Sequence, residues 1–209
     1  MLTGSEVPNL LDWARRLQAI AQTGVAYEDV SVHDRERYEQ VRHIAAEMLA
    51  SNGEVDPIDV LFAAEEGHAT PKLDVRAAVF RDDEILLVHE RDGWSLPGGW
   101  ADVGETPAEA TEREVLEESG YATRAVRLLA LLDRDRQGYP PHPWHIWKVV
   151  FLCELLDEPR RTLGSETDDA RFFARDALPE QLRVNVSTRL LIDRCFEHHL
   201  HRECPADFD

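Results

Sequence analysis

Apolar side chains along this chain follow two different periods, and the change occurs near residue 70. Before that point they recur every three or four positions, which predicts two amphipathic helices over about 9–23 and 34–50. A shorter third helix is predicted after Asp56-Pro57, and the polar segment 65–71 is predicted to be a linker. Residues 1–70 are therefore expected to form a small helical region.

Residues 71–209 carry short apolar runs bounded by turn residues, a pattern typical of strands. Two further helices are predicted in this part, over about 106–120 and 187–201. The predicted strands cover 73–80, 84–90, 94 toward 100, 124–132, 145–155 and 171–174. Strands with helices packed on both faces give an α/β fold, here an α/β/α sandwich around a mixed sheet.

The helix predicted at 106–120 has clear signals at both ends. Thr106 is a good N-cap, Pro107 suits the first helical position, and Glu109 completes a capping box with Thr106. Gly120 supplies the left-handed residue that ends many helices.

Three carboxylates on this helix, Glu114, Glu117 and Glu118, stand at positions i, i+3 and i+4. Because that spacing places them on one helix face, their charges repel one another unless a cation neutralises them. Carboxylate oxygens are hard ligands, so the expected cation is Mg²⁺, with Mn²⁺ as a possible substitute. The pattern therefore predicts a metal site.

Other residues at fixed offsets support this interpretation over a plain solvated acidic face. Arg113 is placed to pair with Glu105 or Glu117 and to hold the site in shape. Gly98 and Gly99 form a turn in which the backbone can approach a ligand closely. A helix face that merely contacts water does not need these partners.

The stretch 99–121 resembles the Nudix box, G-x5-E-x7-R-E-U-x-E-E-x-G-U, in which U is a bulky aliphatic residue. The matching positions are Gly99, Glu105, Arg113, Glu114, Val115, Glu117, Glu118 and Gly120. Tyr121 departs from the pattern at the last position, where the side chain is expected to pack rather than react. The resemblance implies the Nudix fold from about Leu73 onward, in agreement with the predicted sandwich.

The resemblance also implies an activity, the hydrolysis of a nucleoside diphosphate linked to a group X. The products are a nucleoside monophosphate and X-phosphate. The implied metal ligands are the carbonyl of Gly99 and the carboxylates of Glu114, Glu117 and Glu118. Arg113 and Glu105 are expected to orient the site, outside the bond-breaking step.

The general base is left open between a box glutamate, Glu117 or Glu118, and a carboxylate on a late loop. Glu166, Asp168 and Asp169 lie in such a loop, and Glu166 is the preferred late candidate. The alternative is that this loop is simply an acidic surface segment.

The segment 137–145 is rich in aromatic residues and stiffened by prolines between two predicted strands. Tyr139, His142 and Trp144 are the candidates for stacking on a base or a sugar. The alternative is a rigid connection whose aromatic side chains cover the core. His198, His199 and His201, at the end of the last helix, are expected to be surface residues.

The N-terminal segment resembles, more loosely, the helical extension of a Nudix subgroup that includes CDP-choline and ADP-ribose pyrophosphatases. Residues 13–24, Tyr27 and 34–38 carry that likeness. CDP-choline is the first substrate it implies and ADP-ribose the second. Hydrolysis of nucleoside triphosphates is the alternative activity, and a nucleotide-sensing module without catalysis is the alternative class. The two helices are expected to form a homodimer contact.

The formal net charge of −18 argues against general binding of nucleic acids or anionic membranes. No apolar stretch approaches the length needed to span a membrane, and the N-terminus lacks the pattern of a signal peptide. The three cysteines have neither metal-site nor disulfide spacing, so the expected location is the cytoplasm. The expected partner is a small nucleotide.

Overall fold

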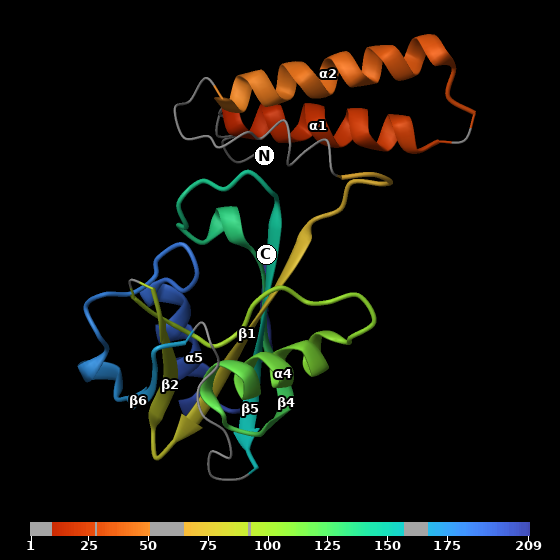
Figure 1. The fold of residues 1–209 in the computed structure, drawn as a ribbon. Coiled ribbons are helices and arrows are strands. Elements are labelled where there is room, and N and C mark those ends of the chain that lie inside the picture. Colours follow the sequence, from red (N-terminus) through yellow and green to blue (C-terminus); the bar gives the residue numbers. More distant parts are fainter. Residues whose placement is uncertain (1–9, 28, 51–64, 92, 157–166) are drawn as a thin grey trace, which may run out of the picture. The chain divides into compact units, whose positions relative to one another are not determined.

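The structure is a computed structural model that describes residues 10–27, 29–50, 65–91, 93–156 and 167–209. The chain divides into two compact units (Figure 1). The helical unit comprises Met1–Pro71 together with Pro141–His145, and the sheet unit comprises Lys72–Pro140 together with Ile146–Asp209.

The helical unit contains a hairpin of α1 (Leu10–Ala26) and α2 (Val32–Ala50), and both helices lie close to their predicted ranges. Helix α1 continues past Gly24, and the absence of a side chain at this position leaves room for α2. A Cβ atom on Gly24 would stand 2.5 Å from the ring of Tyr38 on α2. The predicted third helix lies outside the described residues, and the linker 65–71 has no helix or strand.

Small side chains make most of the contact between these two helices. The buried apolar residues of the hairpin are Ala14, Ala21, Ala45, Ala46 and Leu49. The segment 141–145 joins this packing, because Trp144 contacts the cluster of Ala14, Ala46 and Leu49. This connection therefore belongs to the helical unit, although its neighbours in sequence belong to the sheet unit.

The sheet unit contains a mixed sheet of seven strands in the order β3-β2-β1-β5-β4-β7, with β6 paired to β2. The strands are β1 (Lys72–Arg81), β2 (Glu84–Glu90), β3 (Gly93–Ser95), β4 (Thr123–Asp133), β5 (Ile146–Leu155), β6 (Asp169–Phe173) and β7 (Asp207–Phe208). Strands β1 and β5 run parallel, as do β4 and β7, while the remaining described pairs are antiparallel.

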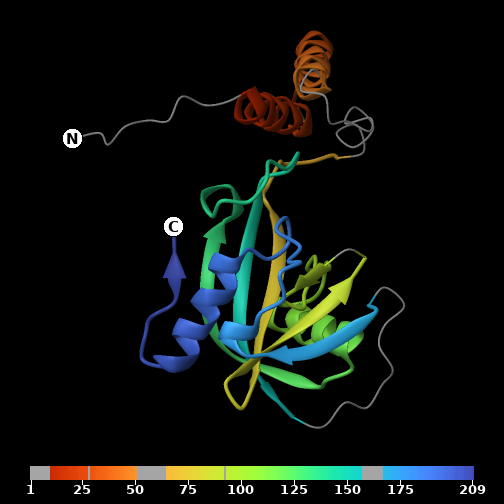
Figure 2. The same cartoon turned by 90° about the vertical axis from the view of Figure 1, so that its left-hand side faces the viewer.

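Two helices cover opposite faces of this sheet (Figure 2). On one face, α4 (Pro107–Ser119) packs Val115 and Ala110 against alternate residues of β1. On the other, α5 (Arg189–Leu200) packs Ile192 and Phe196 against Ala78 and its neighbours. The predicted α/β/α sandwich around a mixed sheet is confirmed.

The structure corrects three details of the sequence analysis. Strand β3 ends at Ser95, because the chain then turns to β1. The carbonyls of Pro97 and Gly99 accept the amides of Ala77 and Val75 there, and Trp100 forms an isolated bridge with Asp74. Strand β7 was not expected. The prediction that His198 is a surface residue is wrong, because His198 is buried and bonds the Asp207 carboxylate of β7 at 3.2 Å.

Tyr121, the residue that departs from the box pattern, packs in the core beside α4. Its ring meets that of Phe172 edge to face, with 5.5 Å between the centroids. The expectation that this position packs is confirmed.

Candidate active site

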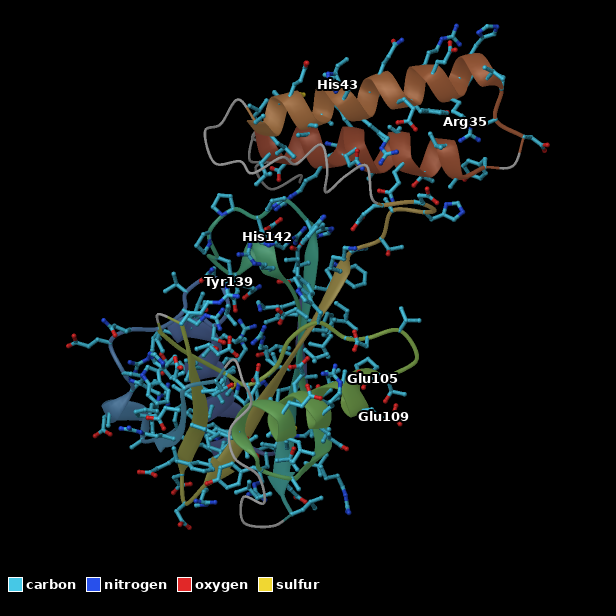
Figure 3. The ribbon with its side chains drawn as sticks, viewed as in Figure 1. Arg35, His43, Glu105, Glu109, Tyr139 and His142 are labelled. Atoms are coloured by element: carbon cyan, nitrogen blue, oxygen red, sulfur yellow. The ribbon has the colours of Figure 1, made fainter. Side chains whose placement is uncertain are left out.

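Helix α4 begins and ends at the residues that its sequence signals indicate. The Thr106 hydroxyl accepts a bond from the amide of Glu109, and the Glu109 carboxylate accepts one from the amide of Thr106. At the other end, Gly120 has a φ of 76° and donates its amide to the carbonyl of Leu116. Figure 3 shows Glu105 and Glu109 at the start of this helix. Local signals therefore determine where the acidic face begins.

The diglycine turn before α4 brings backbone and carboxylates together. Gly98 has a φ of 137°, and a Cβ atom there would stand 2.1 Å from the carbonyl oxygen of Val75. A Cβ atom on Gly99 would stand 2.9 Å from a carboxylate oxygen of Glu114. The Glu114 carboxylate thus fills the space that a side chain at position 99 would occupy.

The Gly99 carbonyl, a predicted metal ligand, accepts a hydrogen bond from the amide of Val75 at 2.8 Å. A carbonyl oxygen has two lone pairs, so this bond leaves one available. Its role as a ligand stays a prediction.

Arg113 is the centre of the ion pairs on α4. It donates two bonds to Glu105, at 2.8 and 3.0 Å, and single bonds to Glu114 at 3.0 Å and Glu117 at 3.1 Å. The sequence suggested Glu105 or Glu117 as its partner, and the structure contains both pairs. The bonds from Arg113 hold the pKa of Glu105 below its ordinary value.

Glu118 lies deeper than the other carboxylates of the trio and accepts a bond from the amide of Gly98 at 2.9 Å. Burial raises the pKa of this carboxyl to about 9, and contact with the carboxylate of Glu90 adds to the shift. Burial also raises the pKa of Glu114. In both cases the burial of the charge outweighs the attraction of nearby arginines, Arg76 for Glu118 and both Arg113 and Arg76 for Glu114.

These residues fit a hard divalent cation by the chemistry of their donors. Carboxylate oxygens and a backbone carbonyl are the ligands that such ions prefer. Among the described residues, no three His, Cys, Asp or Glu side chains stand in the arrangement of a ready metal cage. Arg113 bonds two of the carboxylates and the Gly98 amide bonds the third.

The late loop is described only from its last residues, and Glu166 lies outside the described part of the chain. Asp168 is exposed and pairs with His89, and its amide donates to the His89 carbonyl at 2.8 Å. Asp169 accepts a bond from the amide of Ala170. The end of this loop therefore lies beside the end of β2.

The three predicted substrate residues are divided between the two units. Figure 3 labels two of them, Tyr139 and His142. Tyr139 is buried in the sheet unit, with the charged groups of Arg134 and Lys148 5.1 and 5.0 Å from its ring centroid. Trp144 packs in the helical unit, and its amide donates to the His142 ring at 3.2 Å. The rings of Tyr139 and Trp144 therefore have packing partners, and a role in binding stays a prediction.

Sequence reasoning missed a buried ion cluster beneath the diglycine turn. Arg76 donates two bonds to Asp74, at 2.8 and 2.9 Å, and one to the carbonyl of Leu96 at 3.1 Å. Lys148 donates to the same Asp74 at 2.9 Å. Through Leu96, this cluster supports the segment that leads into the turn. The sequence did contain a signal for this cluster, because Asp74, Arg76 and Lys148 are charged residues within otherwise apolar strands.

Despite the burial of Asp74, Arg76 and Lys148 hold the pKa of its carboxyl below the ordinary value. Burial lowers the pKa of Lys148 to about 8. Asp74 thus compensates both of these buried cations, and Glu118 adds to the compensation of Arg76.

Fold and site together define an α/β protein with a carboxylate site suited to a hard cation beside a glycine turn. Comparison with known families identifies that class. The model of the NUDIX domain matches residues 70–195, and the model described as a UDP-X-like, N-terminal oligomerisation domain matches residues 8–61. The chain belongs to the Nudix family of hydrolases.

Several relatives extend this likeness over most of the chain. A Bacillus subtilis (strain 168) protein, YjhB, provisionally described as an ADP-ribose pyrophosphatase, is 46% identical over 203 residues, covering 95% of this chain and 96% of that one. A crystal structure of a UDP-X diphosphatase is 33% identical, covers 96% of this chain and 98% of its own, and has a TM-score of 0.62. An ADP-ribose pyrophosphatase structure from Streptococcus suis 89-1591 is 40% identical, with 67% of this chain and all of its own covered and a TM-score of 0.61.

Within the described residues, every helix is too short or too polar to cross a membrane.

Proposed function

We propose that this protein is a Mg²⁺-dependent pyrophosphatase that hydrolyses a nucleoside diphosphate linked to a group X. The observation that carries this proposal is the position of two carboxylates against the diglycine turn. Glu118 accepts the amide of Gly98, and Glu114 lies against Gly99. This arrangement gathers carboxylate and carbonyl oxygens at one end of the turn, where a diphosphate and its cation can be held together.

The reaction adds one water across the phosphorus anhydride and releases a nucleoside monophosphate and X-phosphate. A bound Mg²⁺ supplies charge neutralisation for the diphosphate and a lower pKa for a coordinated water. Glu114, Glu117 and Glu118 hold the cation, together with the Gly99 carbonyl. Arg113 orients two of these carboxylates while its other donors are held by Glu105.

The proton of the attacking water passes either to a box glutamate or to Glu166, and substitution separates these candidates. Glu118→Gln is expected to lower kcat by at least about 100-fold, because loss of a metal-binding charge removes several kcal/mol of transition-state stabilisation. Glu166→Gln lowers kcat by a comparable factor if Glu166 is the base and leaves it nearly unchanged if it is not.

A matched control lies on the same helix. Glu112 accepts a bond from the amide of Ala125 at 2.8 Å, and glutamine can accept that bond equally well. Glu112→Gln should therefore keep wild-type turnover. Equal activity of Glu118→Gln and Glu112→Gln, at equal melting temperature, would contradict the metal assignment.

ADP-ribose is the first substrate to test, with UDP-linked sugars and CDP-choline after it. Support for ADP-ribose comes from the descriptions of the B. subtilis and S. suis relatives, and support for a UDP-linked compound from the UDP-X diphosphatase. CDP-choline rests on the resemblance of the N-terminal helices alone.

The products distinguish this activity from its alternative. An assay with Mg²⁺ and a panel of nucleotides should yield AMP and ribose 5-phosphate from ADP-ribose. Release of inorganic pyrophosphate from nucleoside triphosphates, with no cleavage of the linked diphosphates, would replace the proposal by a triphosphate pyrophosphohydrolase. Nucleotide binding without any turnover would replace it by a sensing module.

We also propose that the helical unit joins two copies of the chain. Its match to a model described as an oligomerisation domain supports this, and so does the distribution of its side chains. Alanines are buried between α1 and α2, whereas Trp13, Ile20 and Tyr27 are 46%, 62% and 60% exposed. Trp13 and Ile20 are seven positions apart and lie on one side of α1, and Tyr27 directly follows the helix. A second copy would cover them.

Light scattering coupled to size-exclusion chromatography tests this contact. The wild-type chain should elute as a dimer, and Ile20→Glu should shift it toward the monomer because a charge would be buried in the contact. Val103→Glu, at a fully exposed position of the sheet unit, is the control and should stay dimeric. A wild-type chain that remains monomeric at high concentration would contradict the proposal.

A further inference from the structure

A pair of charged residues outside the Nudix box contacts the most buried carboxylate of the site. Glu90, the last residue of β2, lies with its carboxylate in hydrogen-bonding range of Glu118. The carboxylate of Glu90 also pairs with the guanidinium of Arg183. The side chains of Glu90 and Arg183 are only 15% and 16% exposed, so this contact lies largely out of water.

Two carboxylates in contact at a partly buried place repel each other strongly, because the low local dielectric weakens screening. Arg183 compensates the charge of Glu90, and Arg76 together with the amide of Gly98 compensates that of Glu118 only in part. A divalent cation between the two carboxylates would compensate both. The geometry that is unfavourable without a cation is therefore favourable with one.

Arg183 is held in place by the backbone around it. The amide of Trp94 donates to the carbonyl of Gln181 at 2.8 Å, and the amide of Arg183 donates to the carbonyl of Trp94 at 2.9 Å. This segment thereby continues the sheet beside β3. Arg183 therefore approaches Glu90 from a segment whose backbone is bonded to β3 on both sides of Leu182.

Gly93 allows this close approach. It is the direct register partner of Glu90 in the β2–β3 pair. A Cβ atom on Gly93 would stand 2.9 Å from the carbonyl oxygen of Gln181 and 3.1 Å from Cγ of Arg183. A side chain at position 93 would therefore displace the arginine that pairs with Glu90.

We propose that Glu90 is a further ligand of the catalytic cation, shared with Glu118, and that Arg183 is the positioning residue that aims Glu90 at it. This inference rests on the proposed metal-dependent function. The carboxylate of Glu90 would bind the cation while it keeps its contact with Arg183. Carboxylates that bind metals are commonly oriented by hydrogen bonds from a second layer of residues.

Mn²⁺ binding to the full-length, metal-stripped protein tests this directly, by isothermal titration and by water-proton relaxation without nucleotide. Glu90→Gln should weaken Mn²⁺ binding by about 10-fold or more, the usual range for disturbing a metal ligand or its support. Arg183→Met should weaken it by a smaller factor, and Arg183→Lys should restore part of the loss because it keeps the charge.

Arg175→Met is the matched control, since Arg175 pairs with Glu197 and Asp193 on α5 and should leave Mn²⁺ binding unchanged. Wild-type Mn²⁺ affinity in Glu90→Gln, with affinity lost in Glu118→Gln, would overturn the proposal. If Glu90→Gln does not fold, Glu90→Asp takes its place in the test. Its shorter side chain should also weaken Mn²⁺ binding if Glu90 is a ligand, and wild-type Mn²⁺ affinity in Glu90→Asp would then overturn the proposal. Failure of ADP-ribose hydrolysis would affect the proposed function alone, because these titrations contain no substrate.

Discussion

The two units of this protein bury different kinds of residues. The helical unit places alanines and a glycine between α1 and α2 and leaves Trp13 and Ile20 exposed. The sheet unit buries branched aliphatic side chains on both faces of its sheet, along with the Asp74 ion cluster. Most of the buried apolar residues of the hairpin are alanines, whereas the sheet unit buries many large branched side chains.

This difference relates to what each unit does. A site that holds carboxylates against a glycine turn needs a rigid support, which a well-packed sheet and its braced loop provide. A hairpin with its large apolar residues on the outside has surface left to bury against another chain. The contrast predicts that equivalent changes will have unequal effects in the two units.

The largest effect is expected from Asp74→Asn in the sheet unit. This change leaves Arg76 and Lys148 without their shared carboxylate, and breaking a buried pair in this way costs about 3–5 kcal/mol. Urea unfolding should measure this loss in the free energy of unfolding. Hydrogen exchange should show that the backbone amides of β1 and β5 lose protection. A loss below about 1 kcal/mol would mean that this cluster is not a support of the site.

The same cluster predicts a pH dependence. The pKa of the Asp74 carboxyl is held below its ordinary value in the folded protein. Its contribution to the free energy of unfolding is therefore fully present at a pH above that ordinary value, and it is lost as the pH falls through the pKa of the folded state. In Asp74→Asn, the free energy of unfolding of the sheet unit should therefore fall less steeply as the pH is lowered than it does in the wild-type protein.

A smaller effect is expected from Gly24→Ala in the helical unit. Alanine favours a helix by about 1 kcal/mol over glycine, but the new Cβ atom would collide with the ring of Tyr38. Overpacking of this kind costs about 1–3 kcal/mol, so a net loss is expected. In a Tyr38→Ala background, the same change should become stabilising, and a double-mutant cycle by thermal unfolding measures the coupling. Additive effects would argue against a steric conflict between a side chain at position 24 and the ring of Tyr38.

Removal of the helix cap by Thr106→Ala should cost about 1 kcal/mol, because the first amides of α4 lose an acceptor. Thermal melting should show a decrease of a few degrees, confined to the transition of the sheet unit. Thr106→Ser keeps the hydroxyl and should restore most of the loss. If serine and alanine behave alike, the cap is not the cause.

The smallest effect is expected from Arg37→Met on α2. Arg37 and Asp34 form an ion pair at 2.7 Å, but both side chains are at least half exposed. Exposed pairs of this spacing contribute about 0.5 kcal/mol or less. A loss as large as that from Asp74→Asn would remove the distinction between the ion pairs of the two units.

Much of the fold and part of the site could be predicted from the sequence, because they depend on neighbours in the chain. The limits of α4 follow from Thr106 and Gly120, and the turn between β1 and β2 lies at the expected Asp82-Asp83. The pairing of Arg113 with Glu117 depends on one helical turn. Strand β7 was missed because two residues are too few to show a period.

The contacts that surround the trio could not be predicted in this way. Asp74 meets Lys148 across 74 positions, and Arg183 meets Glu90 across 93. The position of 141–145 in the helical unit depends on the packing of Trp144 rather than on any local signal. Such contacts form only when strands and loops are brought together by the whole core.

The sequence by itself determined the family, the α/β/α architecture and the helix that presents Glu114, Glu117 and Glu118, because helix periodicity and capping act within one turn of the chain. Only the tertiary structure decided which of these carboxylates is buried, that Glu118 contacts Gly98 and Glu90, and that Asp74 supports the turn. Burial and long-range charge pairing depend on how the whole sheet packs, and no local pattern records them.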